Sequence, residues 1–140
     1  MKKGVFTAAL VVALCVVSPL LAARADSPNN PKADVQMGNF FCGADLTAAP
    51  VIGFVNYHRD GNVVSFNFHL KNATPNANYR VELWGNSCTF FGVADTITTN
   101  SKGVANSNSS ITVPATSTRF FATVWGPNGY NDTPAVTLTP

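Results

Sequence analysis

A strict two-residue alternation constrains this chain more than any other feature of its sequence. Between positions 64 and 70, apolar residues at the even positions alternate with polar residues at the odd ones: Val64, Phe66, Phe68 and Leu70 against Ser65, Asn67 and His69. Side chains of a β-strand point to opposite faces in turn, so this pattern predicts a strand with one buried face. No comparable stripe with a helical period follows residue 25. The sequence therefore predicts an all-β domain.

Seven such runs predict about seven strands, separated by clusters of Asn, Gly, Pro, Ser and Thr. They are Val51–Tyr57, Val64–Leu70, Asn78–Trp84, Phe90–Thr99, Gly103–Val113, Arg119–Trp125 and Ala135–Leu138. Asp60-Gly61 suits a two-residue type I′ turn. Pairing Arg59 with Asn62 then sets Val51 opposite Leu70, Val55 opposite Phe66 and Tyr57 opposite Val64, all on one face. Short strands at near-regular spacing predict an immunoglobulin-like antiparallel β-sandwich.

The first 25 residues predict a signal peptide. Lys2 and Lys3 precede an apolar run that ends in Ala23-Arg24-Ala25, a sequence of the kind that signal peptidase cleaves. A membrane anchor is the alternative, but the run is at the short limit for a bilayer span. Cleavage leaves 115 of the 140 residues and changes the net charge from +2 to −1. We expect a secreted protein with a flexible leader at 26–34, one domain at 35–140 and no membrane span after cleavage.

Charge and cysteine content narrow the function. A nearly neutral chain lacks the clustered Lys and Arg that bind nucleic acid or anionic lipid, so neither is an expected partner. Removal of Cys15 with the signal peptide leaves Cys42 and Cys88, and an even pair in an oxidising compartment predicts one disulfide bond. A metal site or a reactive thiol is the alternative. The oligomeric state is not predicted.

Three segments resemble the strand and turn rhythm of small secreted bacterial immunoglobulin-like proteins, among them the apoproteins of enediyne chromoproteins. The segments are Gly61–Leu70, Pro75-Asn76 with Tyr79–Leu83, and Thr98–Val113. The resemblance covers roughly residues 50–138 and implies the sandwich fold. The chain departs from that group in having one candidate disulfide rather than two. Because a shared fold does not carry a shared function, no functional residue is transferred.

The residues do not favour an enzyme. A zinc or copper site needs three or four converging ligands, whereas the two histidines, His58 and His69, lie far apart on the predicted first hairpin. The chain lacks a G-x-S-x-G motif, and its one glutamate, Glu82, is expected to be exposed in an ion pair between neighbouring strands. We therefore expect no catalytic residue, no metal and no cofactor.

Aromatic side chains supply the remaining functional signal. Alternation assigns four of them to outward faces: Phe54, Trp84, Phe121 and Trp125. Exposed rings of this kind stack on sugars or anchor protein interfaces, but the segment from Val35 to Leu46 can also cover them. In an immunoglobulin-like order, Trp84 and Trp125 lie at opposite ends of the domain and form no common site.

The loops 71–77 and 126–134 are expected to share one end of the domain. Together they offer a candidate binding surface of Trp125, Asn128, Tyr130, Asn131, Asn72 and Asn76, with two ordinary polar turns as the alternative. We expect a secreted, non-enzymatic binding module that recognises an extracellular protein, a glycan or a small apolar ligand. The alternatives are a self-assembling component of a cell surface and a small secreted enzyme or inhibitor.

Overall fold

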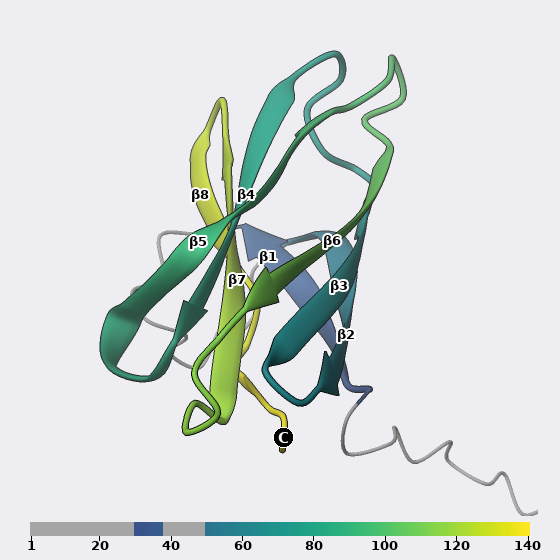
Figure 1. The fold of residues 1–140 in the computed structure, drawn as a ribbon. Helices are drawn as coiled ribbons and strands as arrows, with labels where there is room; N and C mark the ends of the chain where they lie inside the picture. Colours follow the sequence, from purple (N-terminus) through teal and green to yellow (C-terminus); the bar gives the residue numbers. More distant parts are fainter. Residues whose placement is uncertain (1–29, 38–49) are drawn as a thin grey trace, which may run out of the picture.

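The computed structural model describes residues 30–37 and 50–140, and these ranges form an all-β protein. Nine strands are present in this part of the chain (Figure 1). They are β1 (Lys32–Met37), β2 (Val51–Asp60), β3 (Val63–Leu70), β4 (Asn78–Gly85), β5 (Thr89–Thr98), β6 (Ala105–Thr112), β7 (Arg119–Gly126), β8 (Gly129–Asp132) and β9 (Val136–Thr137). A short 3₁₀ turn, η1 (Asn86–Cys88), joins β4 to β5. The all-β prediction is confirmed.

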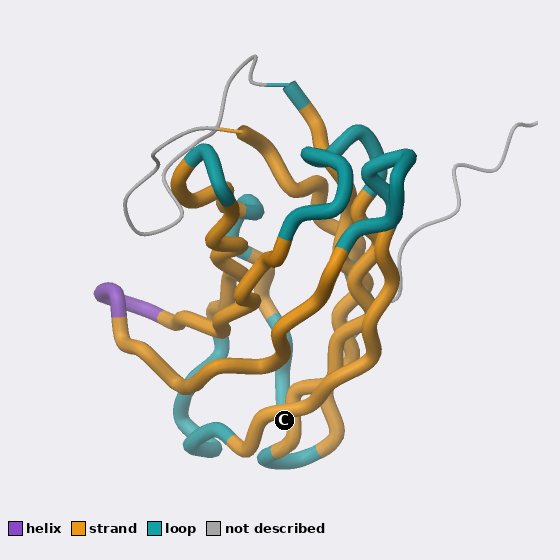
Figure 2. The backbone as a smooth tube through the Cα atoms, turned by 90° about the horizontal axis from the view of Figure 1, so that it is seen from above, coloured by secondary structure: helices purple, strands orange, loops and turns teal. Residues whose placement is uncertain are grey.

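All strands belong to one antiparallel sheet in the order β5-β4-β7-β8-β1-β2-β3-β6, with β9 added to β7. The sheet curls until its two end strands meet, so that it nearly closes into a barrel (Figure 2). Side chains make the closing contacts: Ser107 of β6 donates to the Asp95 carboxylate, and Ser109 Oγ donates to the Ala94 carbonyl of β5 at 2.5 Å. The predicted sandwich is not confirmed, because the pairing of β1 with β8 joins its two halves.

Two strands were missed by the sequence analysis. β1 begins at Lys32, inside the segment that we expected to be a flexible leader, and β8 lies in the expected loop 126–134. β1 carries a local signal that the sequence analysis did not use, because Ala33, Val35 and Met37 alternate with Lys32, Asp34 and Gln36. β8 is only four residues long and has no apolar alternation. The pairing of β1 with β8 covers only two residue pairs, Gln36 with Asp132 and Met37 with Asn131.

The first hairpin has the predicted faces but a different register. Asp60 pairs with Val63, so the turn residues are Gly61 and Asn62 rather than Asp60 and Gly61. Only Gly61 has a positive φ, 54°, as a type II′ turn with glycine in its first central position requires. Each pairing is therefore displaced by two residues, and Tyr57 lies opposite Phe66 instead of Val64. A shift of two keeps every side chain on its predicted face.

The core fills the inside of the curled sheet. Its largest buried side chains include Tyr57, Phe66, Phe68 and Phe120, each at most 1% exposed. Arg59 lies at one end of this core and is 3% exposed. Its guanidinium donates to the carbonyl of Gly61 at 2.7 Å and to that of Ser117, and lies 5.5 Å from the centre of the Phe120 ring.

Candidate functional site

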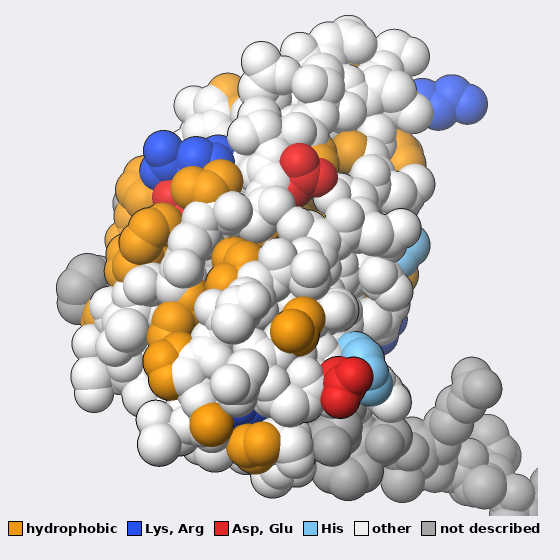
Figure 3. Space-filling view, viewed as in Figure 1, with side chains coloured by type: hydrophobic (Ala, Val, Ile, Leu, Met, Phe, Trp, Pro, Cys, Tyr) orange, Lys and Arg blue, Asp and Glu red, His pale blue; other side chains and the backbone are white. Residues whose placement is uncertain are grey.

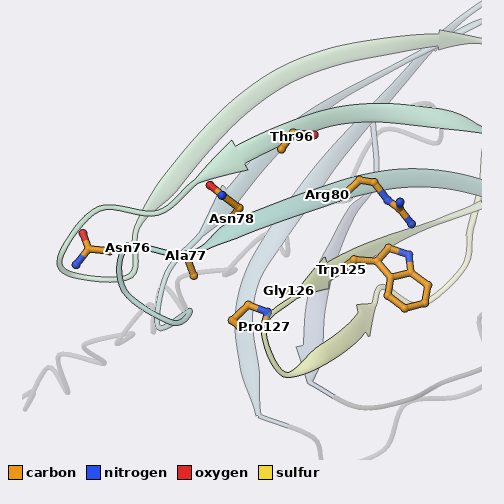
Figure 4. A pocket seen from close by; sticks show the side chains of 8 residues that line it. All are labelled: Asn76, Ala77, Asn78, Arg80, Thr96, Trp125, Gly126 and Pro127. Carbon is orange, nitrogen blue, oxygen red and sulfur yellow. The ribbon is translucent and has the colours of Figure 1, made fainter.

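An open groove of about 670 Å³ lies where β4, β5 and the β7–β8 turn come together (Figure 4). Its lining residues are Asn76, Ala77, Asn78, Arg80, Thr96, Trp125, Gly126 and Pro127. The Tyr79 ring packs where a side chain at position 126 would stand, because a Cβ there would lie 2.2 Å from a ring carbon. Glycine at this position thus allows the β7–β8 turn to lie close to β4.

Trp125 is the main aromatic surface of the groove. Its side chain lies on the outer face of β7 and is 39% exposed. The Arg80 guanidinium lies 5.6 Å from the centre of the Trp125 ring (Figure 4). The Tyr130 ring packs against the indole, with 5.0 Å between the ring centres. These contacts fix the plane of the indole while leaving part of it open to solvent.

One buried carboxylate, that of Glu82, organises this face. Glu82 is 4% exposed, and its Oε2 accepts hydrogen bonds from the indole Nε1 of Trp125 at 2.9 Å and of Trp84 at 3.1 Å. Its Oε1 pairs with the Arg80 guanidinium at 2.7 Å. The expectation of an exposed Glu82 is therefore wrong. Its ion pair is also with a residue of its own strand, not of a neighbouring one.

The two tryptophans belong to one network, contrary to the sequence prediction. β4 and β7 are antiparallel neighbours, as expected, and Trp84 and Trp125 do lie on different residue pairs of the ladder. Glu82 lies between them on the same outer face, and one carboxylate oxygen reaches both indoles. Long side chains thus bridge a separation that strand order alone suggested was too great.

The predicted binding residues fall into two groups. Trp125 and Asn76 line the groove, whereas Asn72, Asn128 and Asn131 line a smaller cavity of about 40 Å³. The two loops share one end of the domain, since Asn128 Nδ2 lies 3.4 Å from Thr74 Oγ1. Tyr130 contacts Trp125 but lines neither space.

Some of these asparagines have a structural role. Asn131 is 7% exposed and donates to the Val124 carbonyl at 3.1 Å. Asn72 and Asn76 have φ values of 61° and 51°, a left-handed conformation that asparagine tolerates better than most residues. The sequence analysis missed Asn78, Arg80 and Thr96 as groove residues. The alternation of Arg80, Glu82 and Trp84 along β4 is the signal that points to this face.

The other outward aromatics are more covered than Trp125. Phe121 is 4% exposed, and Phe54 stacks on His69 at 4.6 Å beneath the ammonium group of Lys32. Most of the segment Val35–Leu46, which was expected to cover the outward aromatic side chains, lies outside the described residues. Cys42 lies outside them as well. The bond between Cys42 and Cys88 therefore stays a prediction.

A second carboxylate, Asp132 of β8, lies near Glu82. It is 1% exposed, and burial together with the charge of Glu82 raises its pKa to about 6, against the opposing effect of a hydrogen bond from Thr123. Within residues 30–37 and 50–140, no three His, Cys, Asp or Glu side chains gather as metal ligands. The histidines are apart, with His58 beside Asn30 and His69 beside Asn106.

No protein-family model matches the chain, and no curated protein matches it. None of the helical residues in the described ranges forms a segment long and apolar enough to cross a bilayer. The groove and the network around Glu82 are the features of the described residues that indicate a function.

Proposed function

We propose that the protein is a secreted, non-enzymatic module that binds a neutral glycan in the groove beside Trp125. The observation that carries the proposal is a partly exposed indole held in a fixed plane next to amide and guanidinium donors. Tryptophan presents a large apolar face on which the C–H face of a sugar ring can stack, while its orientation is set by the N–H hydrogen bond.

The polar lining suits hydroxyl groups. The Thr98 hydroxyl donates to Asn78 Oδ1 at 2.7 Å, which leaves the amide N–H groups of Asn78 to serve a ligand. Thr96 adds a hydroxyl, and the Arg80 side chain is 52% exposed. A groove of about 670 Å³ is within the range of sites that hold small ligands.

The charge balance favours a neutral ligand over an acidic one. Arg80 is the one cation of the groove lining, and its charge is compensated by Glu82 at 2.7 Å. Both carboxylate oxygens of Glu82 already accept hydrogen bonds from side chains, which favours a structural role for this group. Few charged side chains lie on the face of the molecule seen in Figure 3.

We also propose that the domain is an exported immunoglobulin-like sandwich. The pairings of β2 with β3, β3 with β6, β4 with β7 and β7 with β8 correspond to A–B, B–E, C–F and F–G of an immunoglobulin-like sandwich. They support that fold, with β1 as an added strand. The proposal includes cleavage after residue 25, export of the mature protein and a disulfide bond between Cys42 and Cys88.

Binding to soluble polysaccharides tests the proposal. Affinity electrophoresis with a β-glucan, a mannan and an arabinoxylan, against polygalacturonate as the acidic comparison, should show retardation by at least one neutral polymer. Trp125→Ala should then weaken binding at least tenfold, as expected for a central aromatic anchor. Phe90→Ala is the matched control, because Phe90 is 49% exposed but lies outside the groove lining.

Two results would reject glycan binding in the groove. One is the absence of retardation by every neutral polymer. The other is equal loss of binding in the Trp125 and Phe90 variants, since this would assign binding to general apolar adhesion of the outer face.

A further inference from the structure

Two buried oxygens at the junction of β1 and β8 lack hydrogen-bond partners. Gln36 and Asp132 are directly paired across this junction, so their side chains share a face of the sheet. Gln36 Oε1 and Asp132 Oδ1 are both buried, and neither has a partner in the part of the chain that the structure describes. Buried acceptors without donors are rare because each loses its hydrogen bonds to water. Two such acceptors on directly paired residues indicate that one hydrogen is shared between them.

The surroundings of Asp132 favour its neutral form. The negative charge of Glu82 on β4 raises the pKa of Asp132. Arg80 is already paired with Glu82. The Thr123 hydroxyl of β7 opposes the shift, and the Tyr57 phenol of β2 has a pKa raised above its usual range by burial and, to a lesser degree, by Asp132. The described neighbours thus supply no cation that balances an ionised Asp132.

We propose that protonation of Asp132 stabilises the pairing of β1 with β8. The protonated carboxyl donates through Oδ1 to Gln36 Oε1, and both orphan acceptors gain a partner from one proton. Ionisation removes this hydrogen bond and places a second negative charge near Glu82. The junction has only two residue pairs and joins the two halves of the sheet, so the loss of one bond there removes a large share of its stabilisation.

The inference is independent of glycan binding, and its pH window follows from linkage. The pKa of Asp132 is about 6 in the folded protein against 3.8 for a free side chain. A raised pKa in the folded state means that the stabilisation is complete below pH 4 and is lost as the pH rises towards 6. Acidic conditions should therefore tighten the junction.

Amide hydrogen exchange of Gln36 and Asp132 tests this directly. After correction for intrinsic exchange, the opening constant of these amides should rise about tenfold per pH unit between pH 4 and 6 and then level off. Asp132→Asn should abolish the rise, because its amide donates at every pH. Asp34→Asn, at an exposed carboxylate on β1, is the matched control and should keep it.

A second measurement keeps the inference testable if the Asn variant folds poorly. The carboxyl ¹³C resonance of Asp132 in the unmodified protein should titrate near pH 6. Titration near pH 4, or opening that stays flat or falls between pH 4 and 6, would overturn the proposal. In that case the Gln36 amide N–H donates to an ionised Asp132 instead. An equal slope in the Asp132 variant would place the proton elsewhere.

Discussion

Replacing Glu82 by glutamine tests how much the buried carboxylate contributes to the stability of the domain. The substitution preserves the shape of the side chain but exchanges one acceptor oxygen for an NH₂ group. If the amide oxygen faces the two indoles, the NH₂ group faces the Arg80 guanidinium; if it faces Arg80, the NH₂ group faces two indole N–H donors. Donors oppose donors in either orientation, so at least one buried contact is lost.

The expected cost follows from the partners. Hydrogen bonds to a charged group contribute about 1.5–3 kcal/mol each, and breaking a buried ion pair costs about 3–5 kcal/mol. Arg80 is 52% exposed and can be hydrated after the change, which places the value at the lower end. We expect Glu82→Gln to lower the free energy of unfolding by about 3 kcal/mol. For a domain of this size, that lowers Tm by about 12 °C.

Thermal and urea unfolding measure the effect, with Arg80→Lys as the matched control. That variant keeps a cation opposite the buried Glu82 carboxylate and leaves the two indole hydrogen bonds intact, so it should cost at most about 1 kcal/mol. Both indole N–H resonances should also move in the Glu82 variant. A loss below 1 kcal/mol, or an equal loss in both variants, would refute the assignment of Glu82 as the centre of the network.

Two other predictions concern the core and the cysteines. Arg59→Met should lower the free energy of unfolding by about 3 kcal/mol, because the carbonyls of Gly61, Ser117 and Leu138 lose a charged donor; a change below 1 kcal/mol in urea unfolding would contradict this. Mass spectrometry of the exported protein should show a start at Asp26 and the loss of two hydrogens at Cys42 and Cys88. Free thiols would reject the disulfide.

The strand faces were predictable because they depend on local sequence. Alternation in β3 correctly assigns Phe66 and Phe68 to the core, and the two-residue error in register leaves that assignment unchanged. The error itself came from turn chemistry, since Asp-Gly suits one type of turn and Gly-Asn another. The same error gave Arg59 the wrong partner: it pairs with Val64 instead of Asn62, and its side chain is buried.

The sequence by itself determined the all-β class, seven of the nine strands in the described residues and the outward position of Trp84 and Trp125. These depend on the period of two, which each segment carries alone. Only the tertiary structure decided that Glu82 is buried, because the side chain covering it from β7 is 43 positions away in the chain. The same holds for the pairing of Gln36 with Asp132, because the two strands lie far apart in the chain and neither segment specifies its partner.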